Sequence, residues 1–527
     1  MSYPGRSLYL LSRRQLQGRR RHGKGGEKSA EAIVIGEKKA DEGPNQLKQG
    51  ADRNISMGME RQKQAIYQLD LFGGEPKFVG HGTGGNGGTG ATVREALQVP
   101  AAKERKRALT QDLMERVTQV HNLNKAWKHV KANKGAPGVD GMTVEELRGW
   151  LSAHKDELVE LLKEGSYRPQ PVRGVQIPKP GGGMRQLGIP TVVDRLVQQA
   201  ILQVLEPILD PIFSKSSFGF RPGRSAHDAL KRARMYVAEE RMIVVDMDVE
   251  KFFDRVNHDV LMARLARHVE DKRLLRIIRR FLEAGILQDG VCTPRYEGTP
   301  QGGPLSPLLA NLLLDDLDKE LEQRGHRFCR YADDCNIYVR TIEAGQRVME
   351  SITQFLEERL HLKVNTEKSA VAPVWERKFL GHRLLHTGEL GIAPQSIARF
   401  KERIRQITRR NRAASLATMI EELNTYITGW VTYFRYAKCK GHLENLDSWI
   451  RRKLRCVRLK QCKRVMAIAT FFRSLGVPEW RAWIGALSGK GWWRLSGTPQ
   501  ASEAMSIAWF NNQGLMSLSK RYLTVKR

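Results

Sequence analysis

Three aspartates stand where strand-like segments of the sequence end, and together they would suit metal-dependent phosphoryl transfer. Asp248 lies near the end of the apolar run at 242–249, and Asp333 and Asp334 lie in the turn predicted within 327–339. If these segments are neighbours in one sheet, the three carboxylates converge, and their repulsion favours bound cations. Carboxylate oxygens are the ligands that Mg²⁺ prefers, and two such ions about 4 Å apart can hold the attacking and leaving oxygens of an in-line displacement.

The order of the motifs is more specific than the aspartates themselves. An Asp-Asp pair alone is a weak signal, because turns often contain acidic residues, and Asp246 remains open as the acid of the first strand. The acid-bearing strand is followed by a Gln-Gly-Gly-Pro turn at 301–304 that opens a helix, and then by Tyr-Ala-Asp-Asp at 331–334. The order of these three segments is therefore a stronger indication of phosphoryl transfer than any one segment alone.

Hydrophobic spacing predicts the elements that must position these residues. Apolar residues recur at helical spacing from Leu113 to Val130, and Thr143 with Glu146 forms a capping box that begins the next helix. The predicted strands are 172–178 and 184–189, which form a hairpin, 242–249, two strands within 327–339, 360–364 and 379–385. Further helices are predicted at 192–209 and 302–321 and over most of the chain from 394 onward.

Composition indicates a folded chain with a polyanionic partner. The 527 residues, of which 41% are hydrophobic, are enough for about three or four domains. The 88 Lys and Arg exceed the 57 Asp and Glu by 31. A chain this basic suits nucleic acid, because each neutralised phosphate releases counterions. A small neutral metabolite is disfavoured as the substrate.

Other classes of protein fit the composition poorly. Six cysteines without a CxxC pair do not suit a disulfide scaffold, and a zinc site drawn from Cys439, His442, Cys456 and Cys462 has poor spacing. No apolar run reaches about 18 residues, so we expect no membrane partner. A reducing, bacterial-type cytoplasm fits best. The alternative is organellar import directed by the acid-free residues 1–26.

Several stretches together resemble group II intron-encoded reverse transcriptase/maturases, from about residue 110 to near the end of the chain. They are IPKP at 177–180, RQLGIP at 185–190, FGFRPGRS at 218–225, DVEKFFD at 248–254, PQGGPLSP at 300–307, YADD at 331–334, EKS at 367–369, FLG at 379–381, and NTY, GW and YFR within 424–435. In combination these motifs are very specific.

The resemblance implies an α+β fold, a right-hand polymerase with fingers and palm. An all-α thumb (maturase domain X) and a small basic DNA-binding region would follow. The boundaries we expect are a disordered basic and glycine-rich extension at 1–92, a helical RNA-binding extension of the fingers at 93–170, fingers and palm at 171–390, the thumb at 391–465, and the DNA-binding region at 466–527.

The resemblance also implies roles at the active site. Asp248, Asp333 and Asp334 match the catalytic carboxylates that hold two Mg²⁺ ions, and the backbone carbonyl of Val249 would join them. The match favours Asp248 over Asp246 as the first acid.

Substrate contacts follow from the same matches. The dNTP-binding residues would be Arg173, Lys179, Arg185, Phe253 and Gln301, and the template or primer residues Arg221, Arg224, Lys368, Phe379, Leu380 and Gly381. Several cations on one element suit a triphosphate. Phe253, or else Phe252, matches the aromatic residue that blocks a ribose 2′-OH, and the other would be a core residue.

The C-terminal part would bind nucleic acid. Residues 451–464 hold eight Lys or Arg and no acid, and such a run suits an RNA surface. The thumb residues that would bind RNA are Arg435, Lys438, Arg451, Arg452 and Lys453. Many family members add a zinc-dependent nuclease, whereas this sequence ends at Arg527 without paired CxxC motifs, so we expect no endonuclease activity.

The favoured function is an RNA-directed DNA polymerase that is also a maturase promoting splicing and retrohoming of its intron. Its partners would be group II intron RNA, an RNA template, a DNA primer or target, and dNTPs, and a homodimer remains open. Two alternatives remain: a non-catalytic RNA-binding splicing factor, or a reverse transcriptase recruited by a diversity-generating element, a retron or a CRISPR locus.

Overall fold

The computed structural model describes residues 112–178, 182–489 and 491–526. The predicted extension at 1–92 and Lys179 lie outside these residues. Within the described ranges, no helix is long and apolar enough to cross a membrane.

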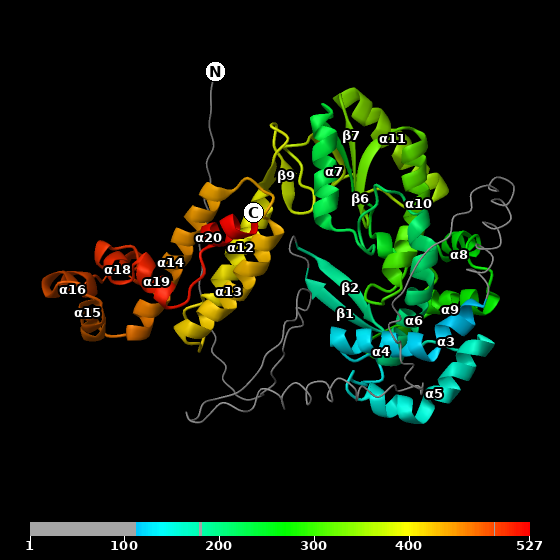
Figure 1. Cartoon of the computed structure of the whole chain (residues 1–527), viewed down its shortest axis with the longest axis horizontal. Coiled ribbons are helices and arrows are strands. Elements are labelled where there is room, and N and C mark those ends of the chain that lie inside the picture. The colour runs from blue at the N-terminus through cyan, green and yellow to red at the C-terminus, as the bar shows by residue number, and fades with distance from the viewer. Residues whose placement is uncertain (1–111, 179–181, 490, 527) are drawn as a thin grey trace, which may run out of the picture. The chain divides into compact units, whose positions relative to one another are not determined.

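Strands and helices are mixed up to residue 392, and helices alone follow (Figure 1). The strands are β1 (Val172–Pro178), β2 (Met184–Ile189), β3 (Ile243–Met247), β4 (Ile286–Gln288), β5 (Val291–Thr293), β6 (Arg327–Tyr331), β7 (Asp334–Val339), β8 (Ala370–Pro373), β9 (His382–Leu384) and β10 (Leu390–Ile392). The helices before residue 392 are α3 (Leu113–Thr118), α4 (Val120–Asn133), α5 (Leu147–Glu164), α6 (Val192–Leu209), α7 (Ala226–Ala238), α8 (His258–Ala266), α9 (Lys272–Glu283), α10 (Ser306–Gln323) and α11 (Ile342–Arg359). Those after it are α12 (Pro394–Ile407), α13 (Leu416–Tyr433), α14 (Lys440–Cys462), α15 (Val465–Ser474), α16 (Glu479–Ala486), α17 (Trp492–Leu495), α18 (Pro499–Ala504), α19 (Ile507–Asn512) and α20 (Leu518–Lys526).

The helix predicted over 113–130 is broken between α3 and α4, where Gln119 has an extended ψ of 133°. The Thr118 hydroxyl donates to the carbonyl of Met114, and the Asn122 amide donates to that of Val117. Such side chains compete with the backbone for helical carbonyls, which a hydrophobic pattern does not reveal.

The first sheet has the order β2-β1-β4-β5 and contains the predicted hairpin. In its register Arg173 pairs with Ile189, and Ile177 pairs with Arg185. Because directly paired and alternate residues share a face, Arg173 and Arg185 lie on the same face. β4 and β5 were not predicted from the sequence.

The second sheet has the order β6-β7-β3-β8, with every pair antiparallel. Val245 and Ile337 lie on one face in a core shared with α10 and α11, whereas Val244 and Tyr338 lie on the other face in a core shared with α7. Figure 1 shows β6 and β7 between these helices. This burial on both faces explains the apolar sequence of β3.

Two strand predictions were wrong in detail. At 360–364 only Val364 forms a bridge, with Val249, and the alternating leucines are instead buried in the core. At 379–385 the chain makes a tight turn before β9, which pairs with β10. An alternating apolar pattern predicts which side chains are buried. In these two segments the side chains are buried although the backbone forms no continuous ladder of strand hydrogen bonds.

The helices after residue 392 share one hydrophobic core that runs from Ile392 to Tyr522. The Asn424 side chain joins α13 to the last segment, donating to the Gly514 carbonyl at 2.7 Å and accepting from the Met516 amide at 2.8 Å. The helical pattern predicted from 394 onward is confirmed. The boundary between 465 and 466 stays a prediction.

Candidate active site

The second sheet brings the three predicted aspartates together. Met247, the last residue of β3, pairs with Cys335 of β7. Asp248 follows Met247 and Asp334 precedes Cys335, so the two aspartates are next to each other in the register of this antiparallel pair. The expectation that the two strands are sheet neighbours is therefore confirmed.

Asp333 lies in the two-residue turn that joins β6 to β7, in which Tyr331 pairs with Asp334. Ala332, the first residue of the turn, has a φ of 58°, and Asp333 is not in the left-handed region. This is the pattern of a type II′ hairpin turn, whose first central position is normally Gly. A left-handed alanine is strained and requires support from its surroundings.

That support comes from the buried side chain of Arg330. Its guanidinium donates to the Ala332 carbonyl and to the Asn311 side-chain oxygen, both at 2.9 Å, and pairs with Asp318. The Arg330 and Asp318 side chains are both 0% exposed. Because a buried ion pair is tolerated only when its hydrogen bonds are made, this network holds the turn in one place.

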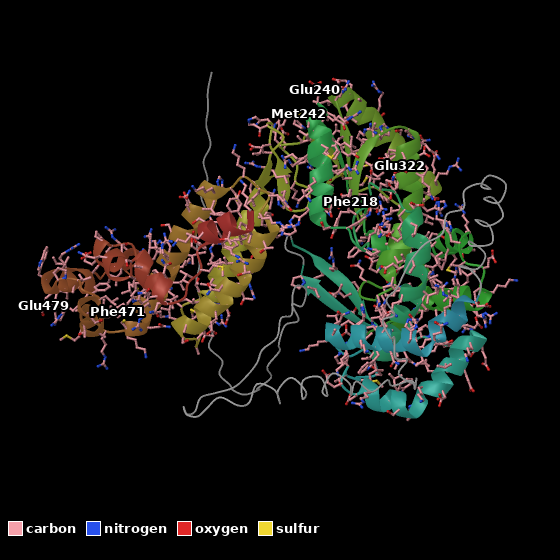
Figure 2. All side chains as sticks on the ribbon, in the orientation of Figure 1. Phe218, Glu240, Met242, Glu322, Phe471 and Glu479 are labelled. Carbon is pink, nitrogen blue, oxygen red and sulfur yellow. The ribbon has the colours of Figure 1, made fainter. Side chains whose placement is uncertain are left out.

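The other side of the turn lies against Gly219. A Cβ atom at Gly219 would lie 2.4 Å from the Ala332 nitrogen, so only glycine allows this approach. The Asn311 amide donates to the Gly219 carbonyl at 2.9 Å. The preceding Phe218 is buried in the core that includes α7 (Figure 2).

The carboxylates of the site repel one another. Burial, followed by the charges of Asp246, Asp333 and Asp248, raises the pKa of Asp334 to about 8. Burial also raises the pKa of Asp333, with the charge of Asp248 adding to the effect. A bound cation would relieve this repulsion.

The donor set suits a hard divalent cation, since it consists of carboxylate oxygens. In this structure Asp248 contacts the Lys368 ammonium, with Nζ 3.1 Å from Oδ2. Among the described residues, no three His, Cys, Asp or Glu side chains are already arranged to hold a metal ion. The chemistry of these residues therefore fits a divalent metal ion.

Asp246, the alternative acid, is engaged elsewhere. Its carboxylate accepts from Arg377 Nε at 2.8 Å, and the same guanidinium donates to the Lys368 carbonyl at 2.6 Å. Asp246 therefore ties β3 to the segment that carries Lys368. This arrangement supports Asp248 as the first acid of the site.

One of the predicted nucleotide-binding residues, Arg185, lies near the carboxylates. Arg185 is exposed and close enough to Asp333 for its charge to oppose the rise in that pKa. Arg173 lies on the same face of the hairpin. The carbonyl of Gln301 accepts from the Gly188 amide at 3.0 Å, which joins the 301–304 turn to the hairpin.

The two adjacent phenylalanines differ in burial. Phe252 is 2% exposed, whereas Phe253 is partly exposed and packs against the core, with its ring perpendicular to that of Phe252. Phe252 is thus the core residue of the pair. The role of Phe253 at a ribose stays a prediction.

Arg221 is held within its own loop, and the template contact expected of it stays a prediction. It is 7% exposed, and its guanidinium donates to the Asp210 carboxylate and to the carbonyls of Asp210, Ser214 and Ser217. Those contacts use its donors to hold the loop that carries Gly219. Arg224 also donates to the carbonyls of Lys215 and Ser217, but is partly exposed.

The predicted primer residues form a tight turn. Phe379 and His382 exchange both backbone hydrogen bonds, and the intervening Leu380 and Gly381 have φ values of 50° and 75°. Two left-handed central residues indicate a type I′ turn. The Tyr433 hydroxyl donates to the Leu380 carbonyl at 2.8 Å, so a thumb residue supports the turn.

The predicted RNA-binding residues of the thumb differ in their partners. Lys438 pairs with Glu389 at 2.9 Å, and Arg435 lies over the Tyr436 ring. Arg452 and Lys453 lie near the Trp493 ring, and Arg451 is partly exposed.

Sequence reasoning missed the residues that support the site. Arg330, Asp318 and Arg377 were not singled out, although Arg330 directly precedes the Tyr-Ala-Asp-Asp motif. The signal available was Arg330 itself, a charged residue that follows Phe328 and Cys329 in a predicted strand, because a buried charge requires a partner.

Comparison with known proteins identifies the domains. A family model described as "Reverse transcriptase (RNA-dependent DNA polymerase)" matches residues 177–384, and one described as "Group II intron, maturase-specific domain" matches residues 397–472. The predicted polymerase fold with a helical maturase domain is thereby confirmed.

Individual proteins with similar sequences come from the same kind of family. Protein YkfC of Escherichia coli is 33% identical over 59% of this chain and 91% of its own length. The group II intron-encoded protein LtrA of Lactococcus lactis is 35% identical over 48% of this chain, which spans only 41% of LtrA. A solved chain of a partial Cas6-RT-Cas1–Cas2 complex is 26% identical over 47% of this chain and 43% of its own, with a TM-score of 0.32. The chain belongs to the family of reverse transcriptase/maturases encoded by group II introns.

Proposed function

We propose that this protein polymerises DNA on an RNA template from dNTPs, with two Mg²⁺ ions at Asp248, Asp333 and Asp334. The observation that carries the proposal is the convergence of these aspartates at adjoining strand ends, within a matched reverse transcriptase domain. Bound Mg²⁺ would supply charge neutralisation for the attacking 3′-oxygen and the leaving pyrophosphate. The carbonyl of Val249 is proposed as a further ligand.

The chain's own residues would orient the substrates. Arg185, with Lys179 and Arg173 on the same hairpin, would bind the triphosphate, since several cations match its charge. Phe253 would exclude a ribose 2′-OH by contact with its ring. Gln301 would lie beside the nascent base pair, and the turn at 379–381 would hold the primer.

We also propose that the protein is a maturase, which binds its group II intron RNA and promotes splicing and retrohoming. The match to the maturase-specific domain over 397–472 and the acid-free basic run at 451–464 support this proposal. The name of LtrA, an intron-encoded protein, supports it as well.

Primer extension tests the polymerase proposal. Purified protein is given an RNA template, a DNA primer, dNTPs and increasing Mg²⁺, and template-length DNA is expected. Removal of Mg²⁺ with EDTA should abolish extension, and replacing Phe253 with Val should allow incorporation of ribonucleotides. Extension that persists in EDTA would contradict the metal-dependent mechanism.

Splicing tests the maturase proposal. The RNA transcribed from the DNA that flanks the gene is incubated with the protein at low Mg²⁺, and excised intron is expected. A flanking RNA without an intron would instead favour a reverse transcriptase recruited by another system.

A further inference from the structure

A basic pocket in the thumb is not explained by the polymerase site. It has a volume of about 590 Å³ and lies between the end of α12, the segment after it, α14 and α17. Its lining consists of Arg405, Thr408, Arg409, Arg410, Asn411, Lys453, Cys456, Lys460 and Trp493.

The charges around the pocket are of one sign. Five of the lining residues are Lys or Arg and none is Asp or Glu. Arg405 pairs with Glu402 at the surface, whereas Arg409, Arg410 and Lys460 form no salt bridge with any carboxylate of the described chain. Like charges around one pocket repel one another, and a bound anion would relieve that repulsion.

Lys453 is affected most directly by this crowding. Burial, together with the charges of Arg405 and Arg410, lowers the pKa of Lys453. Its ammonium lies 5.7 Å from the Trp449 ring centroid and 5.2 Å from that of Trp493. The pocket therefore combines unneutralised cations with one aromatic side chain, Trp493, and both kinds of group are used to bind unstacked nucleotides.

The shape of the pocket limits its occupant. A volume of about 590 Å³ is in the range of small-ligand sites, large enough to take a nucleotide. A paired nucleotide in an A-form helix stays stacked and cannot enter a concave site, whereas a bulged or looped nucleotide can. The exposed Asn411 offers its side-chain amide to a base or to a 2′-hydroxyl.

We propose that this pocket binds one unpaired RNA nucleotide with its adjoining phosphates. The proposal rests on the proposed function, because it assumes that the thumb binds RNA. It adds which feature of the RNA the thumb recognises, namely an unpaired nucleotide. Arg409, Arg410 and Lys460 would hold the phosphates, and the base would lie against Trp493 or a guanidinium plane.

The chain offers a matched control for a test. Arg410 lines the pocket, and Arg412, two residues later, instead forms a bidentate pair with Glu422. Both arginines are exposed, so neither Arg410→Gln nor Arg412→Gln is expected to prevent folding. The two substitutions remove the same charge from the same segment.

The experiment measures affinity for two RNA hairpins that differ only by one bulged nucleotide, at several salt concentrations. Wild-type protein should bind the bulged hairpin more tightly than the unbulged one. Arg410→Gln should lose about tenfold in affinity for the bulged hairpin. The slope of the logarithm of its binding constant against the logarithm of the salt concentration should be smaller by about 0.7. Arg412→Gln should resemble the wild type. Trp493→Ala should also reduce the preference for the bulge.

The failures can be told apart. Equal binding of the two hairpins by the wild type, or equal losses in Arg410→Gln and Arg412→Gln, would overturn the pocket while leaving RNA binding intact. Equal preference for a bulged DNA hairpin would overturn the assignment to RNA. Wild-type protein that binds neither hairpin would contradict the proposed function itself.

Discussion

At the scale of single residues, the turn that carries Asp333 depends on a buried arginine. Arg330 is wholly buried and connects Asp318, Asn311 and the carbonyl of Ala332. A buried guanidinium is tolerated because its partners compensate for lost hydration. Arg330 therefore fixes the residue next to Asp333, and we expect it to affect nucleotide addition only through the position of that carboxylate.

Replacing Arg330 with Met should destabilise the protein by about 3–5 kcal/mol, because Asp318 would be left buried without its partner. The measurement is equilibrium unfolding in urea, followed by circular dichroism. The double variant Arg330→Met/Asp318→Leu should recover part of this loss, since it removes both charges. A cost below about 1 kcal/mol for the single variant would show that the pair is not important for stability.

His382 should make stability depend on pH. Burial lowers the pKa of His382 to about 4, while the unfolded chain has the ordinary value near 6.5. Between these values the unfolded state binds a proton that the native state does not, so stability falls as the pH falls from 6.5 to 4. The loss should reach about 3 kcal/mol.

The measurement compares the free energy of unfolding in urea of the wild type and of His382→Gln at several pH values. The contributions of the other titrating groups cancel in the difference between the two proteins. Native His382 is 0% exposed, and its Nδ1 lies 3.1 Å from the Leu380 carbonyl. Parallel profiles for the two proteins would contradict the assignment of a neutral, buried histidine.

At the scale of elements, the hairpin of β6 and β7 is fixed by its contact with the 218–220 segment. A Cβ atom at Gly219 would lie 2.4 Å from the Ala332 nitrogen, and one at Gly429 in α13 would meet nothing within 4 Å. Gly219→Ala must therefore displace the turn that carries Asp333.

Gly219→Ala should reduce the rate constant of nucleotide addition by about tenfold or more, because displacements of about 1 Å in an active site have effects of this size. Gly429→Ala should leave that rate unchanged and stabilise the helix by up to about 1 kcal/mol. Single-turnover primer extension gives both rates. Equal rates for the two variants would show that Gly219 does not position the turn.

Sequence periodicity predicted the hairpin of β1 and β2, the strand β3 and the long helix α6 with bounds close to those observed. It did not predict the break at Gln119, where side chains of Thr118 and Asn122 bind helical carbonyls. Local patterns report which residues are buried, and they do not report which polar group reaches which partner.

At the scale of the whole molecule, the site and the pocket are built from distant segments. Asp248 and Asp333 were predicted from their places at a strand end and in a hairpin turn, and Lys368 from the resemblance to the family. The structure brings Asp248 and Lys368 together at 3.1 Å. The template role of Arg221 stays a prediction, and its guanidinium donates to groups inside its own loop. The basic pocket joins residues from 405 to 493, and no sequence pattern linked them.

The net charge of +31 is likewise a property of the molecule as a whole. It supports binding to a polyanion, with strong dependence on salt, and says nothing about catalysis. The two activities therefore have to be separated by a substitution that changes the chemistry and leaves the basic surfaces unaltered.

The most direct test measures primer extension and RNA affinity in the same preparations of the wild type and Asp334→Asn. Asn has nearly the same shape as Asp but cannot supply an anionic ligand. We predict template-length DNA from the wild type, no detectable product from Asp334→Asn, and the same salt-sensitive RNA affinity for both. Extension by Asp334→Asn at the wild-type rate, or RNA binding by a wild type that makes no DNA, would contradict the account.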